Sequence, residues 1–163
     1  MALTAKRITE NFKELEDLNN EAFPKEERVS IERMIDLSQT GISDLYGVYD
    51  ENTFVGFFMT MTSDTCVYLF YLAICSSLRS HGYGGRTLMD DLYQRQIVLD
   101  MEPLDDQAAN YEQRLRRTKF YASHGYRSSG YHLFYWNQTF DLLCTRGPFL
   151  KDDFIEITKE LQR

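Results

Sequence analysis

A glycine-rich segment near the middle of the chain has the residue types of an anion-binding site. The apolar run from Val67 to Ile74 is rich in β-branched and aromatic residues, which is typical of a buried strand. It is followed by the glycine-rich stretch 79–85 and then by a helical pattern with Leu88 and Leu92 on one face. Glycines let a backbone approach a ligand closely, and the N–H groups and dipole of a helix N-terminus attract negative charge. The segment therefore predicts a site for a phosphate-bearing ligand.

Two common phosphate-binding motifs do not fit this segment. A nucleotide P-loop requires a Gly-Lys pair, and the chain contains none. A dinucleotide fingerprint, G-x-G-x-x-G, could start at Gly82 and Gly84, but its third glycine position is Thr87, and no βαβ unit precedes it. Both interpretations are therefore excluded.

A third pattern, [RQ]-x-x-G-x-[GA], is matched by Arg79, Gly82 and Gly84 between a predicted strand and a predicted helix. This segment resembles the coenzyme A pyrophosphate loop of the GNAT superfamily of acetyl-CoA-dependent N-acetyltransferases. The stretch from Lys119 to Tyr126 resembles the helix-ending signature of the same family, in which an aromatic-Tyr pair is followed by Gly-aromatic. Each feature alone also fits a turn, core packing or a helix C-cap. Their order and spacing together favour the resemblance.

The resemblance implies that acetyl-CoA is the cosubstrate and that its acetyl group moves to a primary amine of a small molecule or protein. A backbone N–H of the central strand would polarise the thioester carbonyl. Arg86 fits equally well as a solvated residue of the first helical turn. The expected cofactor-binding residues are Leu72, Ala73, Ile74, Arg79, Ser80, His81, Gly82, Tyr83, Gly84, Gly85 and Arg86.

Tyr121 occupies the position at which the family carries the acid that protonates the leaving thiolate. A tyrosine pKa near 10 and a thiol pKa near 8.5 make this donation uphill by about 2 kcal/mol, so the help should be modest. Many family members carry an Asn six residues before this tyrosine, where this chain has Leu115. Arg116 or Arg117, in the basic stretch around it, could contact the coenzyme phosphates or pair with the acidic loop 103–110.

A base or a water relay is also needed, because only about one alkyl amine in 2,500 is neutral at pH 7. Asp100 and Glu102 end the strand predicted at 96–101, where many family members place a carboxylate. Being two residues apart, they share a face in a regular strand. Glu102 is preferred because it lies closer to the expected active-site end, although a solvated strand-end carboxylate is an equal alternative.

Composition narrows the class of protein. With 163 residues, 43% of them apolar, the chain fits one packed domain covering 1–163. A net charge of −7 disfavours nucleic acid as a partner and mildly favours a cationic acceptor. The three histidines lack metal-ligand spacing, so no metal is expected, and three cysteines without C-x-x-C spacing suggest reduced thiols. No apolar run is long enough to span a membrane and the N-terminus is too polar for a signal peptide, so we expect a cytoplasmic protein.

The predicted elements give an α+β fold with three layers, α/β/α, around a mixed, mostly antiparallel sheet. Thr9 is expected to cap the first helix and Ser30 the second, and a C-terminal helix at about 150–162 extends beyond the core of the family. The resemblance implies a GNAT-type sheet whose central strand splays from its neighbour. The strands are expected at 3–8, 44–49, 53–62, 65–75, 96–101, 128–136 and 139–145, with further helices after the glycine loop, to about residue 95, and at 111–123.

Several alternatives stay open at this level. The same fold could transfer another acyl group, such as succinyl or propionyl, or it could bind acyl-CoA as a sensor without catalysis. The acceptor is expected to contact the first two helices, the loop near Asp105 and Asp106, and the last hairpin. The chain could be a monomer or a homodimer.

Overall fold

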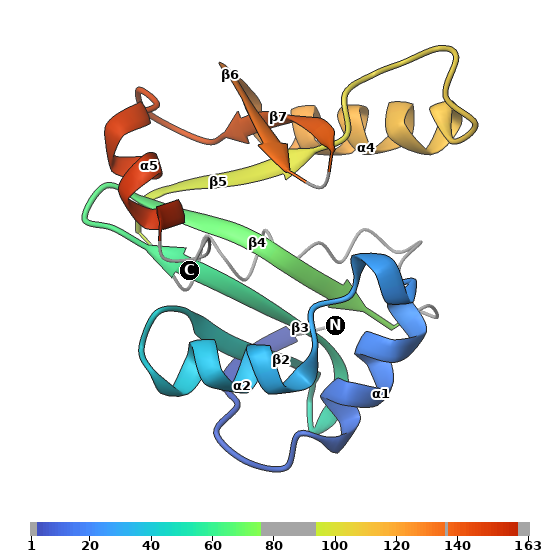
Figure 1. Cartoon of the computed structure of the whole chain (residues 1–163), viewed down its shortest axis with the longest axis vertical. Coiled ribbons are helices and arrows are strands. Elements are labelled where there is room, and N and C mark those ends of the chain that lie inside the picture. Colours follow the sequence, from blue (N-terminus) through green and yellow to red (C-terminus); the bar gives the residue numbers. More distant parts are fainter. Residues whose placement is uncertain (1–2, 76–93, 136, 160–163) are drawn as a thin grey trace.

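The computed structural model describes residues 3–75, 94–135 and 137–159, which build a seven-stranded sheet with helices on both faces (Figure 1). The strand order is β1-β2-β3-β4-β5-β7-β6. Among the described strands, only β4 and β5 pair in parallel, so the predicted mixed, mostly antiparallel sheet is confirmed. The strands are β1 (Leu3–Arg7), β2 (Asp44–Asp50), β3 (Thr53–Thr62), β4 (Cys66–Ile74), β5 (Gln96–Met101), β6 (Arg127–Tyr135) and β7 (Gln138–Cys144).

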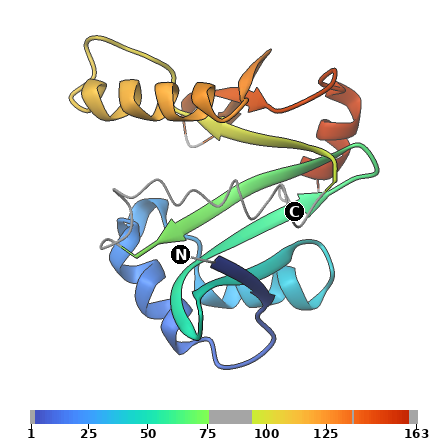
Figure 2. The same ribbon diagram turned by 180° about the vertical axis from the view of Figure 1, so that it is seen from behind.

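The helices cover the sheet as the predicted three layers require. Helices α1 (Lys13–Ala22), α2 (Ile31–Gln39) and α5 (Lys151–Lys159) pack on one face. Helix α4 (Tyr111–Ser123) lies on the opposite face, where Tyr121 packs against the core cluster that contains Leu99. Figure 2 shows the same arrangement from behind. Within the described residues, no helix is long and apolar enough to cross a membrane.

Local sequence signals placed most helix ends correctly, with one clear error. The Ser30 hydroxyl accepts a hydrogen bond from the Arg33 N–H, as expected of an N-cap. The predicted cap at Thr9 is wrong, because α1 begins at Lys13 and Asn11 has a left-handed backbone (φ 58°) that no helix can include. Most of the helix predicted after the glycine loop, to about residue 95, lies in residues 76–93, outside the described part of the chain; residues 94 and 95 are described and are not helical.

The central strand carries a β-bulge that changes which side chains face each layer. Met59 pairs with Tyr71 and Thr60 with Leu69, so Phe70 is an extra residue in β4. Before the bulge, Tyr68 packs on the α5 side and Leu69 on the α4 side. After it, Tyr71 packs against α1 and α2. Without the bulge, strict alternation would place Tyr71 on the same side as Leu69, toward α4. The bulge therefore aims Tyr71 at the helices that lie next to the site described below.

The predicted splay of the central strand is present. The parallel ladder between β4 and β5 runs only from Cys66–Gln96 to Leu69–Leu99. Beyond it, β4 continues along β3 to Ile74 while β5 diverges, as Figure 1 shows. The sheet therefore opens between its two central strands at the end where Leu72 and Asp100 lie.

Candidate functional site

A cavity of about 470 Å³ lies on the α1, α2 and α5 side of this opening. Its walls come from β4, from the end of β5, from β6, from α2 and the connection between α1 and α2, and from α5. They are formed by Phe23, Val29, Arg33, Leu37, Tyr68, Phe70, Tyr71, Leu72, Asp100, Leu133, Phe134, Tyr135 and Thr158. We call it the first cavity. Asp105 and Asp106, expected near an acceptor, are not among its lining residues.

A second cavity, of about 360 Å³, lies where β5 ends beside α4. It is lined by Asp100, Met101, Glu102, Asn110, Arg117, Tyr121, Tyr135, Gln138 and Phe140. Asp100 and Tyr135 belong to the walls of both cavities. The two cavities therefore approach each other at the end of β5, where the sheet opens.

Asp100 is held between two tyrosines at this junction. The Tyr68 hydroxyl donates to one carboxyl oxygen, and the Tyr135 hydroxyl donates to the other over 3.3 Å. Burial raises the pKa of the Asp100 carboxyl, and the two hydrogen bonds oppose that rise. Burial, and then the neighbouring Asp100 charge, raises the pKa of Tyr68 well above its ordinary value. Both tyrosine hydroxyls therefore donate to the same carboxyl group, one to each of its oxygens.

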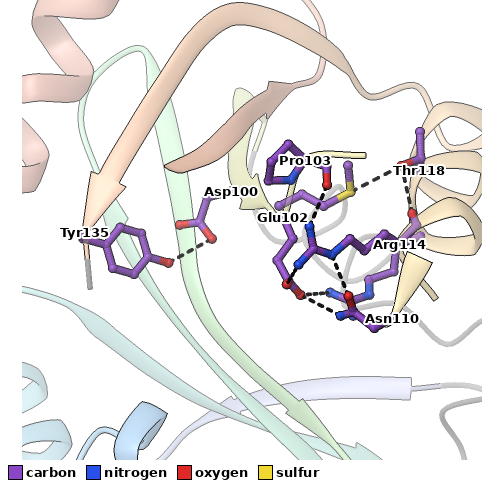
Figure 3. Close-up of polar contacts among 9 residues, drawn as sticks. Asp100, Glu102, Pro103, Asn110, Arg114, Thr118 and Tyr135 are labelled. Carbon is purple, nitrogen blue, oxygen red and sulfur yellow. Dashed lines mark hydrogen bonds and ion pairs between the residues drawn. The ribbon is translucent and has the colours of Figure 1, made fainter. Parts of the chain in front are cut away.

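Glu102 turns in a different direction from Asp100 (Figure 3). Because β5 ends at Met101, the expectation that the two carboxylates share a strand face does not apply. Glu102 forms ion pairs with Arg114 at 2.6 Å and Arg117 at 3.4 Å, both from α4. Arg114 also donates to the Pro103 carbonyl at 3.0 Å, so this cluster ties the 103–110 loop to the helix.

Tyr121 lines the second cavity from α4. Its ring contacts that of Tyr126 edge-on at 5.4 Å. Burial raises the pKa of the Tyr121 phenol, Arg117 lowers it, and the Asp100 charge raises it further. The hydroxyl therefore stays protonated at neutral pH, and it is a weaker acid than a free tyrosine.

The other sequence-predicted residues are placed as follows. Leu72 lines the first cavity, while Ala73 is buried in β4. Ile74 pairs with Gly56 of β3. A Cβ added to Gly56 would lie 2.6 Å from the Ala73 carbonyl oxygen, so only glycine allows β3 to approach β4 this closely. The predicted loop residues, Arg79 to Arg86, lie outside the described residues.

The structure adds residues that sequence reasoning missed. Buried Asn19 of α1 accepts a hydrogen bond from the Tyr71 hydroxyl and donates to the Val29 carbonyl at 2.8 Å. The Val29 N–H in turn donates to the Tyr71 hydroxyl at 3.2 Å, and Phe23 stacks on the Tyr71 ring with centroids 4.5 Å apart. This network fixes the α1–α2 connection over the first cavity. No local pattern marks it, because Asn19 and Tyr71 are 52 residues apart.

The buried phenols predict a loss of stability at alkaline pH. Burial raises the pKa of Tyr71 to about 12. Below about pH 10 this phenol is protonated in both the folded and the unfolded chain. Above that, the unfolded chain releases the proton first, so the free energy of unfolding should fall as the pH rises toward 12. Urea denaturation across this range measures the loss, and Tyr71→Phe should reduce it; an identical loss in both proteins would contradict this assignment.

Comparisons with known proteins bear on the fold. No family model matches the chain, and no curated protein matches it in sequence. A solved structure assigned to the GNAT family of acetyltransferases, from Bacteroides thetaiotaomicron, superposes with a TM-score of 0.76 and 24% identity, covering 97% of this chain and 95% of that one.

Two further solved structures show the same similarity at lower identity. An aminoglycoside 6'-N-acetyltransferase complexed with coenzyme A gives a TM-score of 0.59 and 19% identity over 89% of this chain and 99% of that one. Naa50 of Arabidopsis thaliana, in complex with the bisubstrate analogue CoA-Ac-MVNAL, gives a TM-score of 0.59 and 17% identity over 90% of this chain and 100% of that one. Together with the splayed β4–β5 pair, these similarities confirm that the chain has the GNAT acetyltransferase fold.

Proposed function

We propose that the protein is an N-acetyltransferase that moves the acetyl group of acetyl-CoA to a primary amine. The observation that carries this proposal is the opening between β4 and β5, with a cavity on each side of the sheet and Asp100 in the walls of both. A thioester and an amine brought in from opposite sides would meet there. Proximity of the two reactants is itself a large part of the catalysis such a site can supply.

The donor would approach along β4 from the α4 side. Backbone groups of Leu72, Ala73 and Ile74 would hold the pantetheine arm, and one N–H would stabilise the oxyanion. Arg79 to Arg86 would hold the pyrophosphate, as the sequence resemblance implies. Arg117, at the second cavity, is a further candidate for a phosphate contact, although its guanidinium already pairs with Glu102.

The acceptor would enter the first cavity, and Asp100 would receive its proton directly or through water. The amine nitrogen then attacks the thioester carbon, the C–N bond forms, and the C–S bond breaks to release the coenzyme thiolate. Of the two carboxylates considered, the geometry favours Asp100. Glu102 does not line the first cavity and already accepts from two guanidinium groups of α4.

Tyr121 would protonate the leaving thiolate. Because burial raises its pKa, donation is uphill by more than the roughly 2 kcal/mol of an ordinary tyrosine–thiol pair. Tyr121→Phe should therefore lower kcat by only about tenfold, below the usual range for a well-matched acid. Steady-state kinetics and acetyl-CoA titration test this: binding should change little, and Tyr111→Phe at the start of α4 is the matched control. An unchanged kcat would remove Tyr121 from the mechanism.

The direct test is release of free coenzyme thiol from acetyl-CoA in the presence of an amine panel. We expect thiol release that depends on the amine and matching acetylated product by mass spectrometry. Thermal stabilisation by acetyl-CoA with no product from any amine would support a sensor role instead. Parallel assays with propionyl-CoA and succinyl-CoA define the acyl preference.

A further inference from the structure

We propose that the acceptor is a small monoamine with an apolar, preferably aromatic, body. This inference rests on the proposed function and concerns the first cavity alone. The similar folds include an aminoglycoside acetyltransferase and one bound to a peptide-containing analogue, so fold does not determine the acceptor. The cavity walls must do so.

The walls of the first cavity are mainly hydrocarbon. Aliphatic and aromatic side chains from α2, from the connection between α1 and α2, from β4 and from β6 form most of the surface. They are Phe23, Val29, Leu37, Phe70, Leu72, Leu133 and Phe134. A polyhydroxylated acceptor placed here would regain few of the hydrogen bonds that it loses to water, because the wall hydroxyls of Tyr68, Tyr71, Tyr135 and Thr158 already donate to other groups. A phenyl or alkyl body would gain from burial.

Charge is arranged for one ammonium group at one end. Of the described residues that line the first cavity, Asp100 is the only acidic one, and it lies at the sheet opening. The amine of an acceptor would therefore point toward Asp100, where the thioester would lie. The volume of about 470 Å³ suits a molecule of one ring or a short chain.

A second cation on the acceptor would meet the wrong charge. Arg33 of α2 lines the same cavity, and its side chain also pairs with Asp36 at 3.7 Å. The guanidinium repels the far ammonium of a diamine, and the remaining walls offer that ammonium little solvation. The cavity should thus reject polyamines, although the net charge of the whole chain is negative.

Phe134 adds an independent indication. Its side chain is 68% exposed, and it also lines the first cavity. A large aromatic ring that remains mostly in water at the edge of an apolar cavity can gain contacts when an apolar ligand arrives. Its exposure also means that truncating it should leave the fold intact.

The experiment compares four amine acceptors, of which hexylamine and 1,6-diaminohexane are matched in chain length. Purified enzyme and saturating acetyl-CoA are tested with 2-phenylethylamine, hexylamine, 1,6-diaminohexane and kanamycin. We expect kcat/KM for the two monoamines to exceed that for the diamine and for kanamycin by about tenfold or more. Faster transfer to the diamine or kanamycin overturns this inference while leaving N-acetyl transfer intact; no transfer to any amine overturns the proposed function itself.

Two variants and one control locate the effect in the cavity. Phe134→Ala should raise KM for 2-phenylethylamine about tenfold without changing KM for acetyl-CoA. Arg33→Gln should lower the ratio of kcat/KM for hexylamine to kcat/KM for 1,6-diaminohexane by about fivefold. Ile155→Ala, on the exposed side of α5 and outside both cavities, should change neither quantity. If Phe134→Ala and Ile155→Ala behave alike, the first cavity does not bind the acceptor's body.

Discussion

Replacement of Asp100 by Asn is expected to lower kcat on the order of a hundredfold or more, the usual contribution of a positioned base. The Asn side chain keeps the shape of the carboxyl group and can still accept a hydrogen bond from Tyr68. It cannot accept a proton from the acceptor amine. The loss should therefore appear mainly in kcat, with acetyl-CoA affinity unchanged.

The pH dependence gives this prediction a second readout. In the wild type, activity should rise with pH as the Asp100 carboxyl loses its proton, and this rise should lie at a higher pH than for a solvent-exposed aspartate, because burial raises the pKa of Asp100. Asp100→Asn should lose this limb of the pH–rate profile. A variant with normal kcat and an unaltered profile would exclude Asp100 as the base.

Two matched substitutions separate chemistry from general effects of losing a carboxylate. Asp141 lies on β7 opposite Met101, pairs with His132 at 2.9 Å and lines neither cavity, so Asp141→Asn should leave kcat within about twofold. Glu102→Gln should mainly lower the stability of the protein and change kcat little, because Glu102 forms the ion pairs with Arg114 and Arg117 that hold α4. A larger kcat loss in Glu102→Gln than in Asp100→Asn would restore Glu102 as the preferred base.

Replacement of Asn19 by Ala is expected to destabilise the protein by about 2–4 kcal/mol, the cost of leaving buried hydrogen-bonding groups unsatisfied. Asn19 is 1% exposed, and its loss removes the acceptor of the Tyr71 hydroxyl and the donor to the Val29 carbonyl. Urea denaturation monitored by circular dichroism measures the change. Because Val29 and Phe23 line the first cavity, KM for the acceptor should also rise.

The adjacent residue supplies the control. Asn20 lies on the same helix and is exposed. Its backbone carbonyl accepts a hydrogen bond from Arg28, and Asn20→Ala keeps that carbonyl. That variant should stay within about 0.5 kcal/mol of wild type. Equal stability of Asn19→Ala and Asn20→Ala would show that the buried network contributes nothing measurable.

Local sequence patterns predicted the order and most of the boundaries of the described helices and strands. The strand at 96–101 and the helix at 111–123 agree residue for residue with β5 and α4. Ser30 marked the start of α2 correctly. These features depend on periodicity and capping within a few residues, and local sequence carries that information directly.

The junction of the two cavities, in contrast, depends on contacts between residues that are far apart in the sequence. The bulge at Phe70 depends on the pairing of β3 with β4, and the different directions of Asp100 and Glu102 depend on where β5 ends beside α4. Tyr68 and Tyr135 reach Asp100 from positions 32 and 35 residues away. Strand register and packing bring such groups together over long separations, so no spacing along the chain could reveal them.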